Sequence, residues 1–183
     1  WRTCGDLSTL NHAERFVLHK DLDYYRERAR KHPRRRGPAP DIYAQLATDR
    51  YCLEKDISHI ETMATNVFYD KTQGYPYHIY ILAIALLFEN RFPRRAAVFG
   101  DVSRGQMRKA LEWAGSVLGN RLQMPDRASD QLLLKRIKPW FPDEQARLNV
   151  LLDLSLSDYD KNLGDLLTDE FSAATLTAYF KKH

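Results

Sequence analysis

The residues with the clearest potential for chemistry stand around Asp101. This acid directly follows a short apolar run and precedes a predicted helix start at Ser103. Arg104 and the free backbone amides of such a start would hold an anion, with Asp101 as a base or as an ion-pair partner. The plainer interpretation, which we favour, is that Asp101 caps the turn and pairs with Arg104.

A second candidate pair is Asp56 and His59. The two residues are three positions apart in a predicted helix, so they share a face and would form an acid–imidazole pair. No nucleophile stands at a fixed spacing from them, which favours a structural role. The sequence also has no P-loop, dinucleotide-binding, serine-hydrolase, zinc-deaminase or H-E-x-x-H motif. We therefore expect no cofactor and no metal site.

Positive charge is concentrated between residues 26 and 36. This segment has seven Lys and Arg residues and one acid, hence a net charge of +6, whereas the whole chain has a formal net charge of +4. Arg34, Arg35 and Arg36 would contact phosphates or an acidic partner. The alternative, which we favour, is a solvated helix end followed by a proline-rich loop. Aromatic residues do not alternate with the arginines as single-strand binders require.

The elements that must position these residues are organised around an apolar stretch, Tyr77–Phe88. Nearly every residue in it is apolar, which is typical of a buried helix or a membrane span. The stretch is well short of the roughly 20 residues that cross a bilayer. We therefore predict the central helix of a core, with four nearly fully buried residues: Ile81, Ile84, Ala85 and Phe88.

A short apolar run and a second helix follow. Residues 96–99 are too few for a helix and predict a buried strand. Ser103 and Gln106 have the spacing of a capping box, and Gly119 supplies a positive-φ end to the helix that they open. The apolar stripe of this helix consists of Met107, Ala110, Leu111, Ala114, Val117 and Leu118.

The fold class predicted from these patterns is mostly α, with at most a small β element near residues 96–99. Residues 1–40 are interpreted as an N-terminal helix and a basic linker rich in proline and arginine, and residues 41–183 as a helix-rich globular domain. Further helices are predicted at residues 7–29, 41–68, 129–137, 142–154, 157–167 and 172–180.

Composition agrees with a globular protein of ordinary type. The chain has 183 residues, of which 44% are hydrophobic and 28% charged. Cys4 and Cys52 are too few for a disulfide framework, and we interpret them as reduced thiols. No signal peptide or membrane span is recognisable, so the expected location is the cytoplasm and no membrane partner is expected.

One pattern resembles a group of known proteins. Its parts are Tyr75-Pro-Tyr77, Glu89-Asn-Arg-Phe-Pro93, Gly100-Asp101, Gln106 and Ala110-x-x-Trp113-Ala114. It is similar to uncharacterised bacterial proteins, some of them encoded near polymorphic or contact-dependent toxins. The resemblance covers mainly residues 75–125 and brings no catalytic residue. It implies a bacterial cytoplasmic protein and, in its specific form, an immunity protein that binds and blocks a toxin.

Three functional hypotheses follow. The first is a non-enzymatic protein-binding module whose candidate contacts are Trp113, Tyr77, Arg94, Asp101 and Arg104. The second is a nucleic-acid-binding module that uses the arginine segment, and the third is an enzyme built around Asp101 or around Asp56 and His59. Trp113 falls outside the apolar stripe of its helix, so it either packs against another element or faces solvent.

Overall fold

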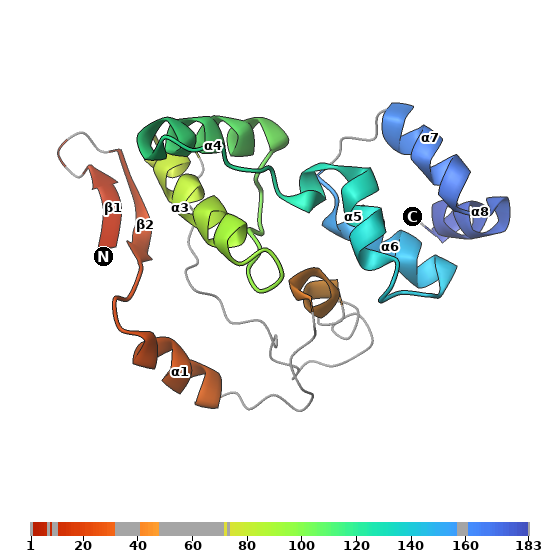
Figure 1. The fold of residues 1–183 in the computed structure, drawn as a ribbon, viewed down its shortest axis with the longest axis horizontal. Coiled ribbons are helices and arrows are strands. Elements are labelled where there is room, and N and C mark those ends of the chain that lie inside the picture. Colours follow the sequence, from red (N-terminus) through yellow and green to blue (C-terminus); the bar gives the residue numbers. More distant parts are fainter. Residues whose placement is uncertain are drawn as a thin grey trace.

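The computed structural model describes residues 2–6, 8, 11–31, 41–47, 72, 74–156 and 161–182. Within these residues the fold is mostly helical, as predicted, with a two-stranded sheet at its N-terminal end (Figure 1). The elements are β1 (Arg2–Asp6), β2 (Asn11–Val17), α1 (Leu22–Lys31), α3 (His78–Arg91), α4 (Arg104–Leu118), η1 (Asp126–Ala128), α5 (Asp130–Ile137), α6 (Glu144–Leu154), α7 (Lys161–Glu170) and α8 (Ala173–Lys182), with one further helical segment at residues 42–47. No helix of the described residues is long and apolar enough to span a membrane.

The N-terminal segment forms a hairpin where the sequence predicted a helix. β1 and β2 pair in antiparallel orientation, with Arg2 opposite Val17. The helix predicted at residues 7–29 is therefore wrong in its first half, because α1 begins only at Leu22. The apolar group at residues 16–18 suggested a helix, but a run this short fits a strand equally well.

Several predictions concern residues outside the described ranges. The helix predicted at residues 41–68 is observed as helix at residues 42–47, where the Asp41 carboxylate accepts the Tyr43 N–H at 2.9 Å as a cap. The predicted residues that lie outside the described part of the chain are Arg34, Arg35, Arg36, Cys52, Asp56 and His59.

Helices α3 and α4 pack together and form the first of two hydrophobic cores seen among the described residues, the α3–α4 core (Figure 1). The prediction of nearly complete burial holds for Ile81 but is wrong for Ile84, Ala85 and Phe88, which are half-buried. A helix that is apolar on every face needs neighbours on every side to be fully covered. The core cluster places α4 and Val98 against α3, which leaves its other sides partly accessible.

Local signals at the ends of α4 are confirmed. The Ser103 hydroxyl accepts the Gln106 N–H at 3.2 Å, and the Gln106 side chain accepts the Ser103 N–H at 2.8 Å. These bonds form the predicted capping box and use two amides that would otherwise lack partners at the helix start. Gly119 ends the helix with φ of 67°, a conformation that favours glycine.

The run at residues 96–99 is extended, but it is not a strand. Side chains take the place of sheet partners, because the Val98 N–H donates to Glu89 and the Val98 carbonyl accepts from Arg127. Successive side chains of an extended chain point to opposite sides. Ala97 accordingly packs against the second core and Val98 against the first.

The second core, the α5–α8 core, unites the helical segment at residues 42–47 with the four C-terminal helices. Its fully buried side chains include Tyr43, Leu133, Ile137, Leu148, Leu151 and Leu163. The predicted C-terminal helices are confirmed in the described residues, where α7 and α8 end at Glu170 and Lys182, a few residues beyond the predicted ends; residues 157–160 lie outside the described part of the chain.

Helix α8 is attached largely through its first turn. The Glu144 carboxylate accepts the Ser172 N–H at 2.6 Å, the Ser172 hydroxyl at 2.8 Å and the Thr175 hydroxyl at 2.7 Å. Leu176 and Tyr179 pack on the α5–α8 core but are only partly buried, and no residue of α8 is fully buried.

Candidate functional site

An exposed pair of aromatic rings joins α3 to α4. The Tyr80 and Trp113 ring centroids are 4.8 Å apart with 72° between the planes, which is an edge-to-face contact. The two side chains nevertheless remain 48% and 41% exposed. The rings therefore fix one another in place and still present apolar surface to solvent.

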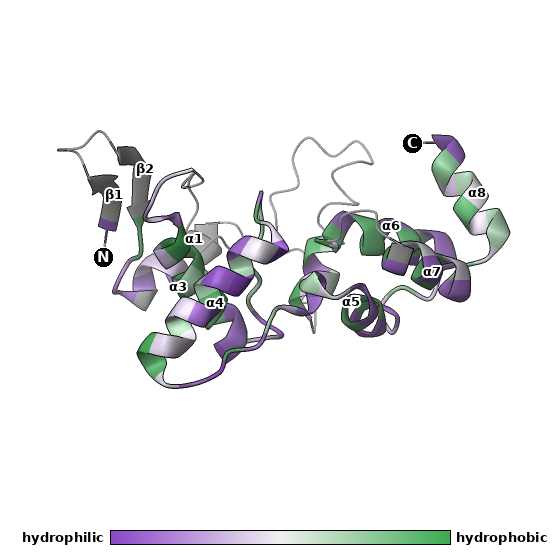
Figure 2. Cartoon of the chain, turned by 90° about the horizontal axis from the view of Figure 1, so that it is seen from above, coloured by the Kyte–Doolittle hydropathy of each residue, from purple (hydrophilic) through white to green (hydrophobic). Residues whose placement is uncertain are grey.

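Other residues extend this surface along both helices. Tyr77 stands one turn before Tyr80, and Val117 stands one turn after Trp113, so helical spacing places each beside its neighbour. Tyr77 is half-buried and its ring lies 5.9 Å from that of Tyr75, whereas Val117 is exposed. Figure 2 shows the hydrophobic character of the C-terminal end of α4. We call Tyr77, Tyr80, Trp113 and Val117 the aromatic face.

Of the predicted contact residues, Trp113 and Tyr77 thus belong to one surface, while the other three lie elsewhere. Arg94 is exposed in the turn after α3 and contributes its carbonyl to the Ile42 N–H at 3.0 Å. Asp101 is exposed, and the ion pair expected with Arg104 is not formed. Arg104 instead contacts the Asp130 carboxylate at 3.2 Å. The Asp130 carboxylate offsets the positive charge of Arg104, which the sequence had suggested as the group that holds an anion.

A buried carboxylate lies at the junction of the two cores. Glu89, at the end of the apolar helix α3, is 3% exposed. Its Oε1 accepts the hydroxyl of Tyr43, which is fully buried, and its Oε2 accepts the Val98 N–H at 2.8 Å. Burial raises the pKa of the Glu89 carboxyl, although both hydrogen bonds and the charge of Arg127 favour its ionised form.

Two arginines complete this junction. Arg127 is buried and donates to the carbonyls of Val98 at 2.6 Å and Leu154 at 3.1 Å. Arg136 donates to Asp41 and Asp126, each at 2.9 Å, and its guanidinium lies 4.1 Å from the centre of the Tyr43 ring.

The role of this junction is to hold segments of the chain together. Both carboxylate oxygens of Glu89 are occupied by protein donors, and Arg127 is committed to two main-chain carbonyls. Burial and the neighbouring Glu89 charge raise the pKa of the Tyr43 hydroxyl, so it keeps the proton that it donates. These groups hold segments together and do not present a reactive atom to a substrate.

One buried imidazole has a vacant hydrogen-bonding position. His78 Nδ1 and the Thr72 hydroxyl share a hydrogen bond of 2.9 Å, and among the described residues Nε2 has no partner. Burial lowers the pKa of His78, which favours the neutral ring. Within the same part of the chain no group of three His, Cys, Asp or Glu side chains is arranged to hold a metal ion.

The roles of Tyr80 and Glu89 were not predicted from the sequence. Tyr80 was counted within a buried helix, and only its partner Trp113 was recognised as lying outside the apolar stripe. The buried role of Glu89 was not predicted, since its partner Tyr43 is 46 positions away in the sequence. The sequence did contain one indication for Glu89, because this residue stands at the end of an all-apolar helix. A carboxylate at such a position either marks the boundary with solvent or is itself buried.

No protein family, curated protein or solved structure was found to match this chain. The resemblance of residues 75–125 to toxin-associated bacterial proteins therefore stays an expectation.

Proposed function

We propose that this protein is a non-enzymatic binding module that recognises another protein through the aromatic face. The observation that carries the proposal is the Tyr80–Trp113 pair, two large aromatic side chains in mutual contact that both remain more than 40% exposed. Tyrosine and tryptophan are the side chains that most often dominate the free energy of protein association. They bring a large apolar area at a small cost in conformational entropy.

The surroundings of the pair suit such a contact. Pre-ordered rings reduce the entropy lost on association, because the Tyr80–Trp113 contact already restricts both side chains. A stable interface buries roughly 800 Å² on each partner, which is more than the pair itself supplies. Tyr77 and Val117 extend the apolar centre of the surface.

In its specific form, the proposal is that the partner is a bacterial toxin and that the protein acts as an immunity protein in the cytoplasm. The support is the sequence resemblance, whose residues 75–125 contain the whole aromatic face. An immunity protein acts by occupying its toxin, so it needs a contact surface and no catalytic group. The fixed groups at the Glu89 junction agree with this.

The test is a binding comparison between two tryptophans. Trp113→Ala removes one ring of the pair, and Trp140→Ala serves as a matched control because Trp140 is 44% exposed but lies in the turn after α5. The wild-type chain is used to isolate its partner from the native host, and calorimetry then measures the affinity of each variant for that purified partner. We expect Trp113→Ala to weaken the complex about tenfold or more and Trp140→Ala to leave it unchanged.

Two further outcomes discriminate the hypotheses. A folded Trp113→Ala protein with unchanged affinity would remove the aromatic face from the account. If the isolated partner is instead a nucleic acid, affinity falls steeply with salt and the Arg34, Arg35 and Arg36 segment becomes the contact. Asp101→Asn should leave partner affinity unchanged under the proposed function.

A further inference from the structure

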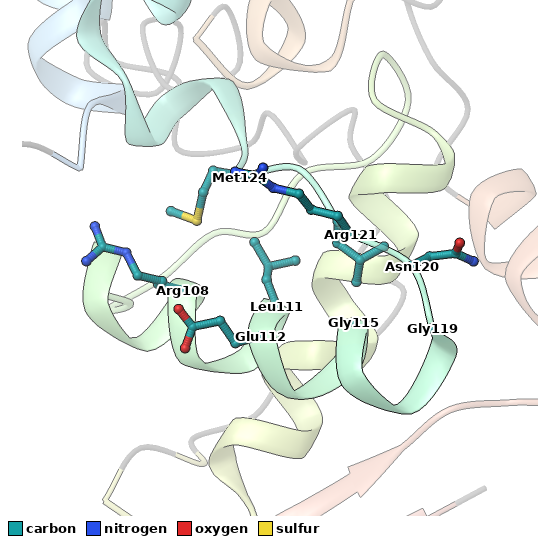
Figure 3. A pocket seen from close by; sticks show the side chains of 9 residues that line it. Arg108, Leu111, Glu112, Gly115, Gly119, Asn120, Arg121 and Met124 are labelled. Atoms are coloured by element: carbon teal, nitrogen blue, oxygen red, sulfur yellow. The ribbon is translucent and has the colours of Figure 1, made fainter.

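A pocket of about 580 Å³ lies against α4 (Figure 3). Arg108, Leu111, Glu112 and Gly115 form its helical wall, and the return segment at residues 119–124 forms the other. With about 100° between successive residues of a helix, these positions and Trp113 fall on opposite flanks of the buried stripe. The pocket is therefore independent of the proposed protein contact.

The return segment is fixed at both ends. At one end, the Gly119 and Asn120 N–H groups both donate to the Gly115 carbonyl, and a Cβ on Gly115 would lie 2.8 Å from the Asn120 carbonyl oxygen. Only glycine allows this approach. At the other end, the Asn90 side chain exchanges two hydrogen bonds of 2.9 Å with the Gln123 main chain.

These two attachments hold the return segment beside α4, so the pocket is formed by the fold itself. The chain touches α4 at Gly115, departs from it, and is then held by Asn90 of α3. The space between the two attachments is the pocket. A pocket that is formed before binding saves its ligand the cost of ordering the chain.

The lining combines an apolar floor with a cationic rim. Leu111 is buried, and Leu122 and Met124 are half-buried beside it. Arg108 and Arg121 are exposed at the rim, and Figure 3 shows the Arg121 side chain running back across the pocket toward Met124. Among the described residues no carboxylate forms an ion pair with either guanidinium.

The remaining polar groups decide the charge of a suitable ligand. Glu112 also borders the pocket, so the two arginines and this acid leave a net charge of +1. That balance favours a single negative charge over a doubly charged group. A pocket of this volume is in the range of small-molecule sites, about 300–1,000 Å³.

We propose that this pocket binds a small amphipathic carboxylate. The apolar body of the ligand lies over Leu111 and Met124, and its carboxylate receives charge-assisted hydrogen bonds from Arg121. The ligand class is a monoanion with an aromatic or aliphatic body.

The probe is 4-phenylbutyrate, with 4-phenylbutyramide as its uncharged analogue. The protein is labelled at its methionine methyl groups, and the Met124 signal is assigned from its absence in Met124→Leu. We expect 4-phenylbutyrate to shift the Met124 signal saturably, with the amide at least about tenfold weaker. The signal of Met107, which is fully buried in the α3–α4 core, serves as an internal reference.

Charge variants locate the site. Arg121→Gln should weaken 4-phenylbutyrate at least about fivefold, while Lys109→Gln, an exposed cation on the same helix that does not line the pocket, should leave it unchanged. Trp113→Ala should bind the probe normally even if it has lost its protein partner. Equal affinity for acid and amide, equal loss in Arg121→Gln and Lys109→Gln, or no shift of the Met124 signal would each overturn the proposal.

Discussion

The two cores of this protein differ in how completely they are covered. The α5–α8 core has four helices and the segment at residues 42–47 around it, and it holds most of the largest fully buried side chains. Among the described residues, the α3–α4 core consists of two helices and the extended segment at Val98, with partly buried side chains such as Leu122, Met124 and Leu156 packed against it. Its uncovered flanks carry both the aromatic face and the pocket. The comparison indicates that apolar side chains stay accessible where few of the described elements cover them.

The exposed apolar residues of the other region are arranged differently. Leu132 and Trp140, for example, come from α5 and from the turn after it. Isolated apolar side chains are common on protein surfaces and need no partner to explain them. Tyr80 and Trp113 instead contact each other, which concentrates apolar area at one place.

The largest expected effect comes from placing a charge in the less covered core. Leu82→Asp buries an unpaired carboxylate, because Leu82 is buried among α3–α4 core residues. We expect a loss of more than about 3 kcal/mol in the free energy of unfolding, measured by urea denaturation with circular dichroism. Leu151→Asp in α6 is the matched variant for the other core. A Leu82→Asp protein of normal stability would show that α3 is peripheral.

A medium effect should come from the junction between the cores. Glu89→Leu removes the acceptor for both the Tyr43 hydroxyl and the Val98 N–H, and each buried donor left without a partner costs about 1–3 kcal/mol. Glu89→Gln keeps an acceptor and a neutral side chain, so it should destabilise less. Chemical denaturation of both variants measures the difference. Equal losses in the free energy of unfolding would mean that the shape of the side chain, and not its hydrogen bonding, matters at this position.

The same residue gives a signed pH dependence. Burial raises the pKa of Glu89 in the folded state above its unfolded value near 4.5. The folded protein therefore binds the Glu89 proton more tightly than the unfolded chain does. The resulting stabilisation of the fold is fully present below pH 4.5 and is lost as the pH rises through the raised pKa. The stability of Glu89→Gln relative to that of the wild type should therefore increase as the pH is raised from 4.5 to 7.

The smallest effect concerns α8, and its pH dependence has the opposite sign. Hydrogen bonds from Thr175 and Ser172 lower the pKa of Glu144. The stabilisation that the ionised Glu144 carboxylate gives to α8 is present above the unfolded pKa near 4.5. It is lost as the pH falls through the lowered pKa of the folded state. Glu144→Gln should speed amide exchange in α8 at neutral pH without changing global stability measurably. Asp165→Asn, an exposed acid on α7, is the control, and equal exchange in both variants would contradict this role.

Local signals in the sequence predicted local structure well. The Ser103–Gln106 spacing and Gly119 set the ends of α4 through contacts within a few residues, so no tertiary information was needed. The hairpin was missed because the apolar group near Phe16 fits helix and strand equally well, and nothing else in the segment was recognised as a strand signal.

The candidate site was predicted only in part, for the same physical reason. Trp113 was identified because helical periodicity alone places it outside the apolar stripe. Tyr80 was not, since its exposure depends on which sides of α3 the other helices cover. Glu89 and Arg127 were not assigned their roles because their partners lie 9 to 46 positions away in the sequence.

The extended segment between α3 and α4 has a consequence for insertions and deletions. Ala97 packs against one core and Val98 against the other because consecutive side chains alternate. Removing or adding one residue between Pro93 and Ala97 would reverse that alternation and send each side chain to the wrong core. The same change would move the Val98 amide and carbonyl away from Glu89 and Arg127. The length of this segment should therefore be conserved more strictly than the identity of its residues.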